Sequence, residues 1–153
     1  MTDSFSSLAR CVSIFDRLMK MYYDRGLAGF DIGWGQQFFV EYLYDHPGSS
    51  PQEMATYIRV DKATLTKVIK KLTAIGYLQV TSDQRDRRVK HLSLTDKAIP
   101  AAKQIKRIHA DFFETLSKDI SPAQVAAVEQ TLGQMTDNIG QKVWHRREAP
   151  HGT

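Results

Sequence analysis

The chain contains a single cysteine, Cys11, among its 153 residues, so it cannot form an internal disulfide. No apolar run approaches the roughly 18 residues that cross a bilayer. The first residues also lack the basic and apolar segments of a secretory signal. We therefore expect a cytosolic protein with no membrane segment. A hydrophobic content of 42% and a charged content of 25% are typical of a globular fold.

Patterns that carry catalysis or metal binding are also missing from the sequence. The five histidines are scattered, and we find no G-x-S-x-G, no glycine-rich phosphate loop and no H-E-x-x-H. One cysteine without paired histidines does not supply the ligands of a zinc site. We therefore expect neither an enzyme nor a protein with a metal or another cofactor.

The positive charge, by contrast, is concentrated in one segment. The net charge is +4, yet residues 59–90 hold nine basic and three acidic side chains, and the remainder of the chain is slightly acidic. A basic surface on a nearly neutral body indicates a polyanionic partner, although a solvated face also carries charge. The nine basic residues are Arg59, Lys62, Lys67, Lys70, Lys71, Arg85, Arg87, Arg88 and Lys90.

Apolar periodicity predicts two helices before this segment. One spans residues 5–24, and its apolar residues recur at steps of three and four. A second helical pattern spans residues 31–44 and stops at His46-Pro47-Gly48. The stripe of the first helix consists of Leu8, Val12, Phe15, Met19 and Tyr22.

Two further helices are predicted after it. Thr95 and Asp96 cap a helix to about residue 116, in which Pro100 predicts a kink or a delayed start. Ser121-Pro122 begins the last helix, and residues 146–153 are predicted to be disordered. The last helix has one apolar stripe, formed by Val125, Val128, Leu132, Met135, Ile139 and Val143.

The middle of the chain predicts two short helices followed by a hairpin. In the segment 50–53, a serine cap, a proline and a glutamate form a capping box that begins a helix ending near residue 58. Asp61 caps the next helix, which runs to about Ala74 and is stopped by Gly76. Strands are predicted at 77–81 and 89–94, and they are joined by a charged loop. The inward stripe of the second helix is Leu65, Val68, Ile69 and Leu72.

This order places small, hydroxyl and lysine side chains on the outward arc of the second helix, which suits entry into a major groove. Thr64, Thr66 and Lys67 are expected to face that groove. Arg85 and Arg87 of the loop are expected to enter or flank the minor groove, while lysines and Arg88 contact phosphates. The full set of expected DNA contacts is Gln52, Lys62, Ala63, Thr64, Thr66, Lys67, Lys70, Lys71, Arg85, Arg87 and Arg88.

The stretch 50–95 resembles the MarR family of bacterial regulators. The matching motifs are D-K-A-T-L-T-K at 61–67, G-Y-L at 76–78, D-Q-R-D-R-R at 83–88 and L-S-L-T at 92–95. The resemblance implies a mostly α fold with a small β-hairpin wing, namely a winged helix-turn-helix at 33–94 within a single domain, 1–145. It further implies dimerisation through helices 5–25 and 97–145, and binding of a homodimer to a pseudo-palindromic double-stranded DNA operator. Many such proteins are repressors released by small phenolic or amphipathic molecules, or by oxidation.

Two positions depart from the pattern of the family. Val80 stands where the family usually has an arginine that pairs with an acidic residue of the hairpin, and Asp86 can instead pair with Arg85 or Arg88. Arg59 lies in the turn between the two short helices, where glycine or asparagine is frequent. A left-handed backbone at that position would cost about 1 kcal/mol.

An aromatic set on the first two helices and the segment between them predicts a pocket for a small aromatic or phenolic effector, although the same rings can be core. Two alternatives remain for the function. A sequence-tolerant architectural DNA-binding protein would have the same basic wing, and a regulator could sense oxidation through Cys11. We expect Cys11 instead to be a small buried hydrophobe. The aromatic set is Phe15, Tyr22, Phe30, Trp34, Phe38 and Tyr42, and all of them except Phe30 are expected to line the pocket.

Overall fold

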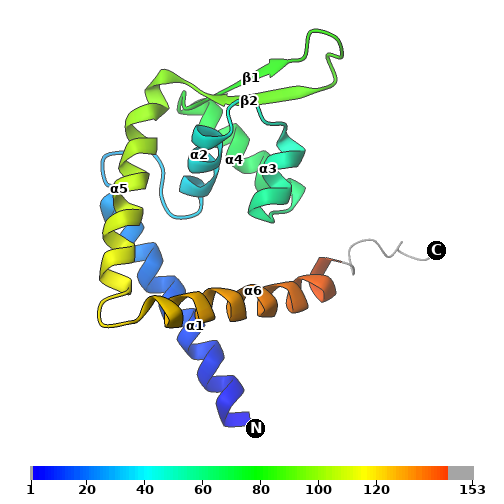
Figure 1. Ribbon diagram of the computed structural model, residues 1–153. Coiled ribbons are helices and arrows are strands. Elements are labelled where there is room, and N and C mark those ends of the chain that lie inside the picture. The colour runs from blue at the N-terminus through cyan, green and yellow to red at the C-terminus, as the bar shows by residue number, and fades with distance from the viewer. Residues whose placement is uncertain (1, 145–153) are drawn as a thin grey trace, which may run out of the picture. The chain divides into compact units, whose positions relative to one another are not determined.

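The computed structural model describes the backbone of residues 2–144 and the side chains of residues 7–143. The tail predicted at 146–153 lies outside the described residues. The chain forms two compact units, residues 1–112 and 113–153, and the first contains the helix-turn-helix and the hairpin (Figure 1). In chain order, the elements are α1 Thr2–Gly26, α2 Gln36–Asp45, α3 Pro51–Ile58, α4 Lys62–Ala74, β1 Leu78–Ser82, β2 Lys90–Leu94, η1 Asp96–Ala98, α5 Ile99–Leu116 and α6 Pro122–Trp144.

The fold class is the predicted one, a mostly helical chain with a two-stranded antiparallel hairpin in its described part. The hairpin extends beyond the cluster formed by α2, α3 and α4 (Figure 1). No helix within residues 2–144 is long and apolar enough to cross a membrane.

The helix-turn-helix forms where the local signals place it. The Glu53 N–H donates to Ser50 Oγ, and the Glu53 carboxylate accepts from the Ser50 N–H, which confirms the capping box of α3. The Asp61 side chain accepts the Thr64 N–H at 2.7 Å and so caps α4. Between the helices, Arg59 has φ 59° and ψ 51°. This is the left-handed conformation that costs about 1 kcal/mol at a residue other than glycine.

The hairpin pairs Leu78 with Leu94 and Ser82 with Lys90. Both strands begin one residue later than predicted, because the N–H groups of the preceding residues bond outside the ladder. The Tyr77 N–H donates to the Leu72 carbonyl, and the Val89 N–H donates to the Asp86 carbonyl. Each strand is therefore a five-residue segment.

The outer edge of β2 is bonded to the segment that precedes α3. The Gly48 N–H donates to the Leu92 carbonyl, and the Leu92 N–H donates to the Ser49 carbonyl, both at 2.8 Å. These bonds form an isolated β-bridge between Ser49 and Leu92. The wing is thereby attached directly to the start of the helix-turn-helix.

The predicted start of the second helix is wrong by five residues. Helix α2 begins at Gln36, because Gly35 before it has φ 95° and the Gly33 carbonyl closes a turn to the Gln36 N–H. From there α2 supplies the centre of the core. Its fully buried Val40 and Leu43 belong to the same buried cluster as Met54, Leu72, Leu92 and Ile105.

The connection from the wing to α5 also differs in part from the prediction. The Thr95 hydroxyl does not cap a helix and donates instead to the Gly76 carbonyl. A 3-10 turn over Asp96–Ala98 comes first, and α5 follows with Pro100 in its first turn. The delayed start predicted from Pro100 is confirmed.

The apolar stripes of α1 and α6 are largely exposed on the single chain. Helix α1 buries Tyr23 near its end, and Leu27 just after the helix is buried too, whereas Leu8, Val12 and Phe15 remain exposed. Tyr23 was not part of the predicted stripe, which included the adjacent Tyr22. On α6 the exposed apolar side chains are Val128, Leu132, Met135, Ile139 and Val143.

Candidate nucleic-acid interface

The outward arc of α4 is solvent-exposed, as its apolar periodicity requires. Leu65 and Leu72 are buried beneath it. One hydroxyl on the arc is committed, since Thr66 Oγ1 donates to the Lys62 carbonyl at 2.7 Å, but its oxygen can still accept a hydrogen bond. The exposed residues are Lys62, Ala63, Thr64, Thr66, Lys67, Lys70 and Lys71.

Two further expected contact residues also have a polar side-chain partner in the chain. Lys71 Nζ donates to Gln36 Oε1 at 3.1 Å, which directs this lysine toward the start of α2. Gln52 Nε2 lies 3.5 Å from Thr56 Oγ1, one turn further along α3, and stays exposed. Both side chains would exchange these weak surface bonds for contacts with a ligand.

The wing loop is organised by its aspartates. Asp83 Oδ1 accepts the N–H groups of Arg85 and Asp86 at 2.8 and 3.1 Å. Asp86 Oδ1 accepts the Arg88 N–H at 3.0 Å. The two carboxylates thus fold the loop through backbone bonds.

The pairing expected for Asp86 is corrected by this geometry. Asp86 does bond to Arg88, but to its backbone N–H and not to its guanidinium. Likewise, Val80 lies in β1 opposite Leu92 with an exposed side chain. The side chains of Arg85, Arg87 and Arg88 are exposed around the folded loop, where they can meet an anion.

An open groove of about 580 Å³ brings the helix-turn-helix and the wing together. Gln52 of α3, Lys62 of α4 and Arg88 of the loop line the same groove. These three residues were predicted to contact DNA from separate parts of the sequence. The groove is also lined by Lys90, which was counted in the basic segment but not among the contacts.

The residue that sequence reasoning missed is His91 of β2. Its Nδ1 lies 2.9 Å from the Gly48 carbonyl oxygen and its Nε2 lies 3.2 Å from Asp83 Oδ2. The hydrogen bond to Asp83, followed by that to Gly48, raises the pKa of His91 above its usual value. The N–H groups of Asp86 and Arg85, and then His91, lower the pKa of Asp83.

The members of the predicted effector set differ in burial in the described chain. Tyr22, Phe30 and Trp34 pack against the core as partly buried rings, and Tyr42 is buried. Trp34 contacts the Tyr23 ring at 5.1 Å and the Phe38 ring at 5.2 Å between centroids. Phe15 is exposed and lies 6.5 Å from the Phe112 ring.

One hollow does contain two members of the set. Phe38 and Tyr42 line an open cavity of about 380 Å³ between α2 and α3, together with Glu41, His46 and Tyr57. The Tyr42 ring stacks on the His46 ring at 4.6 Å. Aromatic walls with a few polar groups are typical of small-molecule sites.

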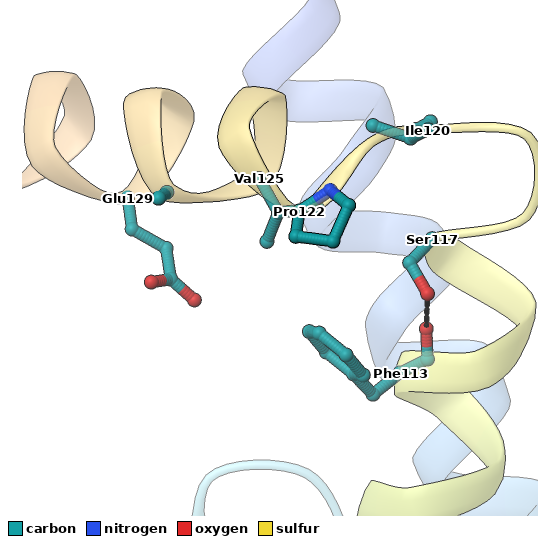
Figure 2. A pocket seen from close by; sticks show the side chains of 7 residues that line it. Phe113, Ser117, Ile120, Pro122, Val125 and Glu129 are labelled. Carbon is teal, nitrogen blue, oxygen red and sulfur yellow. Dashed lines mark hydrogen bonds between the residues drawn. The ribbon is translucent and has the colours of Figure 1, made fainter.

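The unit of residues 113–153 contains a smaller hollow of about 260 Å³. Phe113, Pro122 and Val125 face it, and the Ser117 hydroxyl on its rim donates to the Phe113 carbonyl (Figure 2). Its lining is mainly apolar, with Glu129 at one side. It adds to the apolar surface that α6 leaves exposed.

The structure corrects one further expectation. Cys11 is exposed on α1 and is not buried within this chain. Among the described residues, no three histidine, cysteine, aspartate or glutamate side chains gather as a metal site would require.

Comparison with known proteins shows which family this architecture resembles. The model of the MarR family matches residues 34–90, from the start of α2 through the wing. Residues 34–90 of the chain are therefore similar to the MarR family. This agrees with the motifs at 61–67 and 83–88, which now lie on α4 and in the wing loop.

Named relatives extend the similarity over most of the chain. The HTH-type transcriptional regulator BilQ of Clostridioides difficile is 24% identical over 133 residues, covering 87% of this chain and 90% of the relative. BilQ of Clostridium symbiosum is 27% identical over 118 residues, covering 77% of this chain and 80% of the relative. The family and these relatives are transcriptional regulators and not enzymes.

Solved MarR-family structures share the fold. A MarR protein from Peptoclostridium difficile superposes with a TM-score of 0.81 at 26% identity, covering 92% of both chains. Streptococcus pneumoniae FabT in complex with DNA gives a TM-score of 0.74 at 20% identity, covering 90% of this chain and 98% of that one. The S. aureus MepR–DNA complex gives a TM-score of 0.76 at 24% identity, covering 88% of this chain and 97% of that one.

Proposed function

We propose that this protein is a sequence-specific DNA-binding transcriptional regulator that acts as a homodimer. It recognises a pseudo-palindromic operator, represses its target and is released by a small aromatic or phenolic ligand. The observation that carries the DNA-binding proposal is the groove at which α3, α4 and the wing present Gln52, Lys62 and Arg88 together. Similarity to the MarR family over residues 34–90, together with FabT and MepR solved on DNA, supports the same proposal.

In this proposal α4 enters the major groove. Ala63 permits a close approach of the helix backbone to the bases, and Thr64, Thr66 and Lys67 reach base edges. Lys70, Lys71 and Arg88 bind phosphates. Arg85 and Arg87 enter or flank the adjacent minor groove, where a narrow A·T-rich stretch concentrates negative potential.

The dimer is proposed from the exposed apolar side chains of α1 and α6. The apolar stripes of α1 and α6 stay exposed on one chain, as Val12 at 48% exposure and Ile139 at 67% illustrate. A second copy that covers these faces would remove apolar surface from water. Sedimentation should therefore detect a dimer at micromolar concentration, and a folded monomer there would contradict this arrangement.

Two half-sites read by one dimer should lie about one helical turn apart. The direct test measures fluorescence anisotropy with an inverted repeat taken from the DNA beside the gene, against a scrambled duplex of the same composition. A specific regulator should prefer the repeat by about 10³-fold. Equal affinity for both duplexes would favour the alternative, a sequence-tolerant architectural protein. A reporter gene placed behind the repeat tests repression.

Release by a ligand follows from the aromatic set. A compound that binds beside Trp34 or between α2 and α3 must prefer a dimer whose wings are wrongly spaced for the operator, because equal affinity for both forms shifts nothing. Phenolic compounds would be screened in a Trp144→Phe background, so that Trp34 is the only tryptophan left. Quenching of Trp34 fluorescence together with release of the operator supports the proposal. Quenching without release would show that the compound binds but does not regulate DNA binding.

A further inference from the structure

His91 lies in β2 between two groups that only accept hydrogen bonds. The Gly48 carbonyl oxygen faces Nδ1 at 2.9 Å, and the Asp83 carboxylate faces Nε2 at 3.2 Å. A neutral imidazole carries one N–H and can serve only one of these acceptors. Both contacts are satisfied together only by the imidazolium, which has an N–H on each nitrogen.

We propose that the His91 imidazolium is a positioning residue for the wing, which holds the arginine-bearing loop at 83–88 against the start of the helix-turn-helix and makes operator binding dependent on pH. The inference rests on the proposed DNA-binding function. In this proposal His91 does not contact DNA. It affects operator binding only by positioning the loop.

Each partner of His91 fixes one side of this connection. Asp83 accepts from His91 with one oxygen and from the Arg85 and Asp86 N–H groups with the other, so the loop is folded around the same carboxylate. Gly48 lies two residues before Ser50, the cap of α3, in the segment bridged to β2. His91 therefore joins the loop to the residues that begin the helix-turn-helix.

The surrounding charges favour the imidazolium. Asp83 from the loop and Glu53 from α3 are the carboxylates that act on His91, and both raise its pKa. Lys90, its neighbour on β2, donates to Ser82 Oγ at 2.7 Å and so is directed to β1. Thr81, opposite His91 in the hairpin, carries no charge.

The sign of the pH dependence follows from these shifts. His91 has a raised pKa, so its contribution to wing order is complete below the ordinary value of 6.5 and is lost as the pH rises through the raised value. Asp83 has a lowered pKa, so its contribution is present above the ordinary 3.8 and is lost as the pH falls through the lowered value. Between these limits both members are charged and the wing is held.

The first test needs no DNA. Nitrogen chemical shifts of the histidine rings, followed by NMR across the pH range in which histidines titrate, give the pKa of His91 directly. We expect a value above 6.5 in the wild type and a fall in Asp83→Asn, in which the amide oxygen can still accept from the loop N–H groups. A wild-type pKa at or below 6.5 would overturn the inference.

The second test measures order in the loop. Backbone ¹⁵N relaxation at residues 84–88 should report a more rigid loop at about pH 6 than at about pH 8.5 in the wild type. In His91→Val, which keeps a residue suited to a strand, the loop should be mobile at both. Identical relaxation in all four samples would show that His91 does not position the wing.

The third test is the pH profile of operator affinity at constant salt. Wild-type affinity should fall on the order of three- to tenfold between about pH 6 and about pH 8.5, the loss expected for one charge-assisted hydrogen bond. His91→Val should be weak throughout and equal to the wild type at high pH. His151→Gln, a change at a histidine near the end of the chain, should follow the wild type. A profile of His91→Val that still parallels the wild type would refute the role.

Failure of the inference and failure of the proposed function give different results. If the wild type shows no preference for an operator at any pH, the function is wrong, whatever the ring titration gives. If operator binding is specific but the ring titration and the relaxation do not respond to His91→Val or Asp83→Asn, only the inference is wrong.

Discussion

Helices α3 and α6 begin with the same capping pattern, which differs in one charge. Ser50 and Glu53 close the box of α3, and the Glu53 carboxylate accepts both the N–H and the hydroxyl of Ser50 at 2.7 and 2.9 Å. Ser121 and Gln124 close the box of α6, where Gln124 Oε1 accepts the same two groups at 3.0 and 2.9 Å. The chain thus contains a charged box and a neutral box with a shared geometry.

Removing either serine hydroxyl should lower the free energy of unfolding by about 1 kcal/mol, because one N–H in the first turn loses its partner. The measured quantity is the difference from the wild type in urea unfolding, followed by circular dichroism at one fixed protein concentration. For a chain of this size, about 1 kcal/mol corresponds to a fall of roughly 2–4 °C in the melting temperature.

The pH dependence separates the two boxes. The N–H and hydroxyl of Ser50 lower the pKa of Glu53 below its ordinary 4.5. The stabilisation is therefore present above that value and is lost as the pH falls through the lowered pKa. The cost of Ser50→Ala should shrink on acidification, whereas the cost of Ser121→Ala should not change. Equal pH responses, or no cost at neutral pH, would refute the reasoning.

Three further outcomes are expected. Arg59→Gly should stabilise the protein by about 1 kcal/mol in thermal unfolding, because glycine adopts φ 59° without strain. Arg87→Ala should weaken operator binding and reduce its salt dependence, whereas Lys142→Ala in the dimer arm should do neither; equal behaviour of the two variants would contradict the placement of the wing. Burial raises the pKa of Tyr23 to about 12 from 10.0, so stability should fall between these values of pH, and Tyr23→Phe should remove that part of the fall.

The helix-turn-helix could be predicted almost to the residue, because its signals are local. The Ser50 and Asp61 caps and the left-handed Gly76 fix the ends of α3 and α4 through atoms a few residues apart. The expected DNA contacts on α4 follow from the same signals, since burial of Leu65 and Leu72 leaves the opposite arc exposed. The placement of these residues against DNA stays a prediction.

The errors arise where another contact outweighs the apolar pattern. Residues 31–35 have a helical apolar pattern, yet the positive φ of Gly35 and the hydrogen bond from the Trp34 N–H to Asp24 Oδ1 keep them out of the helix. In α1 the buried tyrosine is Tyr23, not Tyr22, because its hydroxyl meets His109 Nδ1 of α5 at 2.6 Å. A pattern read along one helix does not contain the second helix that selects its buried face.

The wing illustrates both cases within a few residues. The sequence offers three arginines as partners for the loop aspartates, but backbone N–H groups take those positions. Such groups are already fixed by the turn, whereas a guanidinium would lose the freedom of a long side chain on pairing. The arginines are thereby left exposed for an anionic partner. The cation that does pair with Asp83 is His91, whose second contact, Gly48, lies 43 residues away. Only the bridge between Ser49 and Leu92 brings that carbonyl to the ring, so no spacing within the loop could have identified His91.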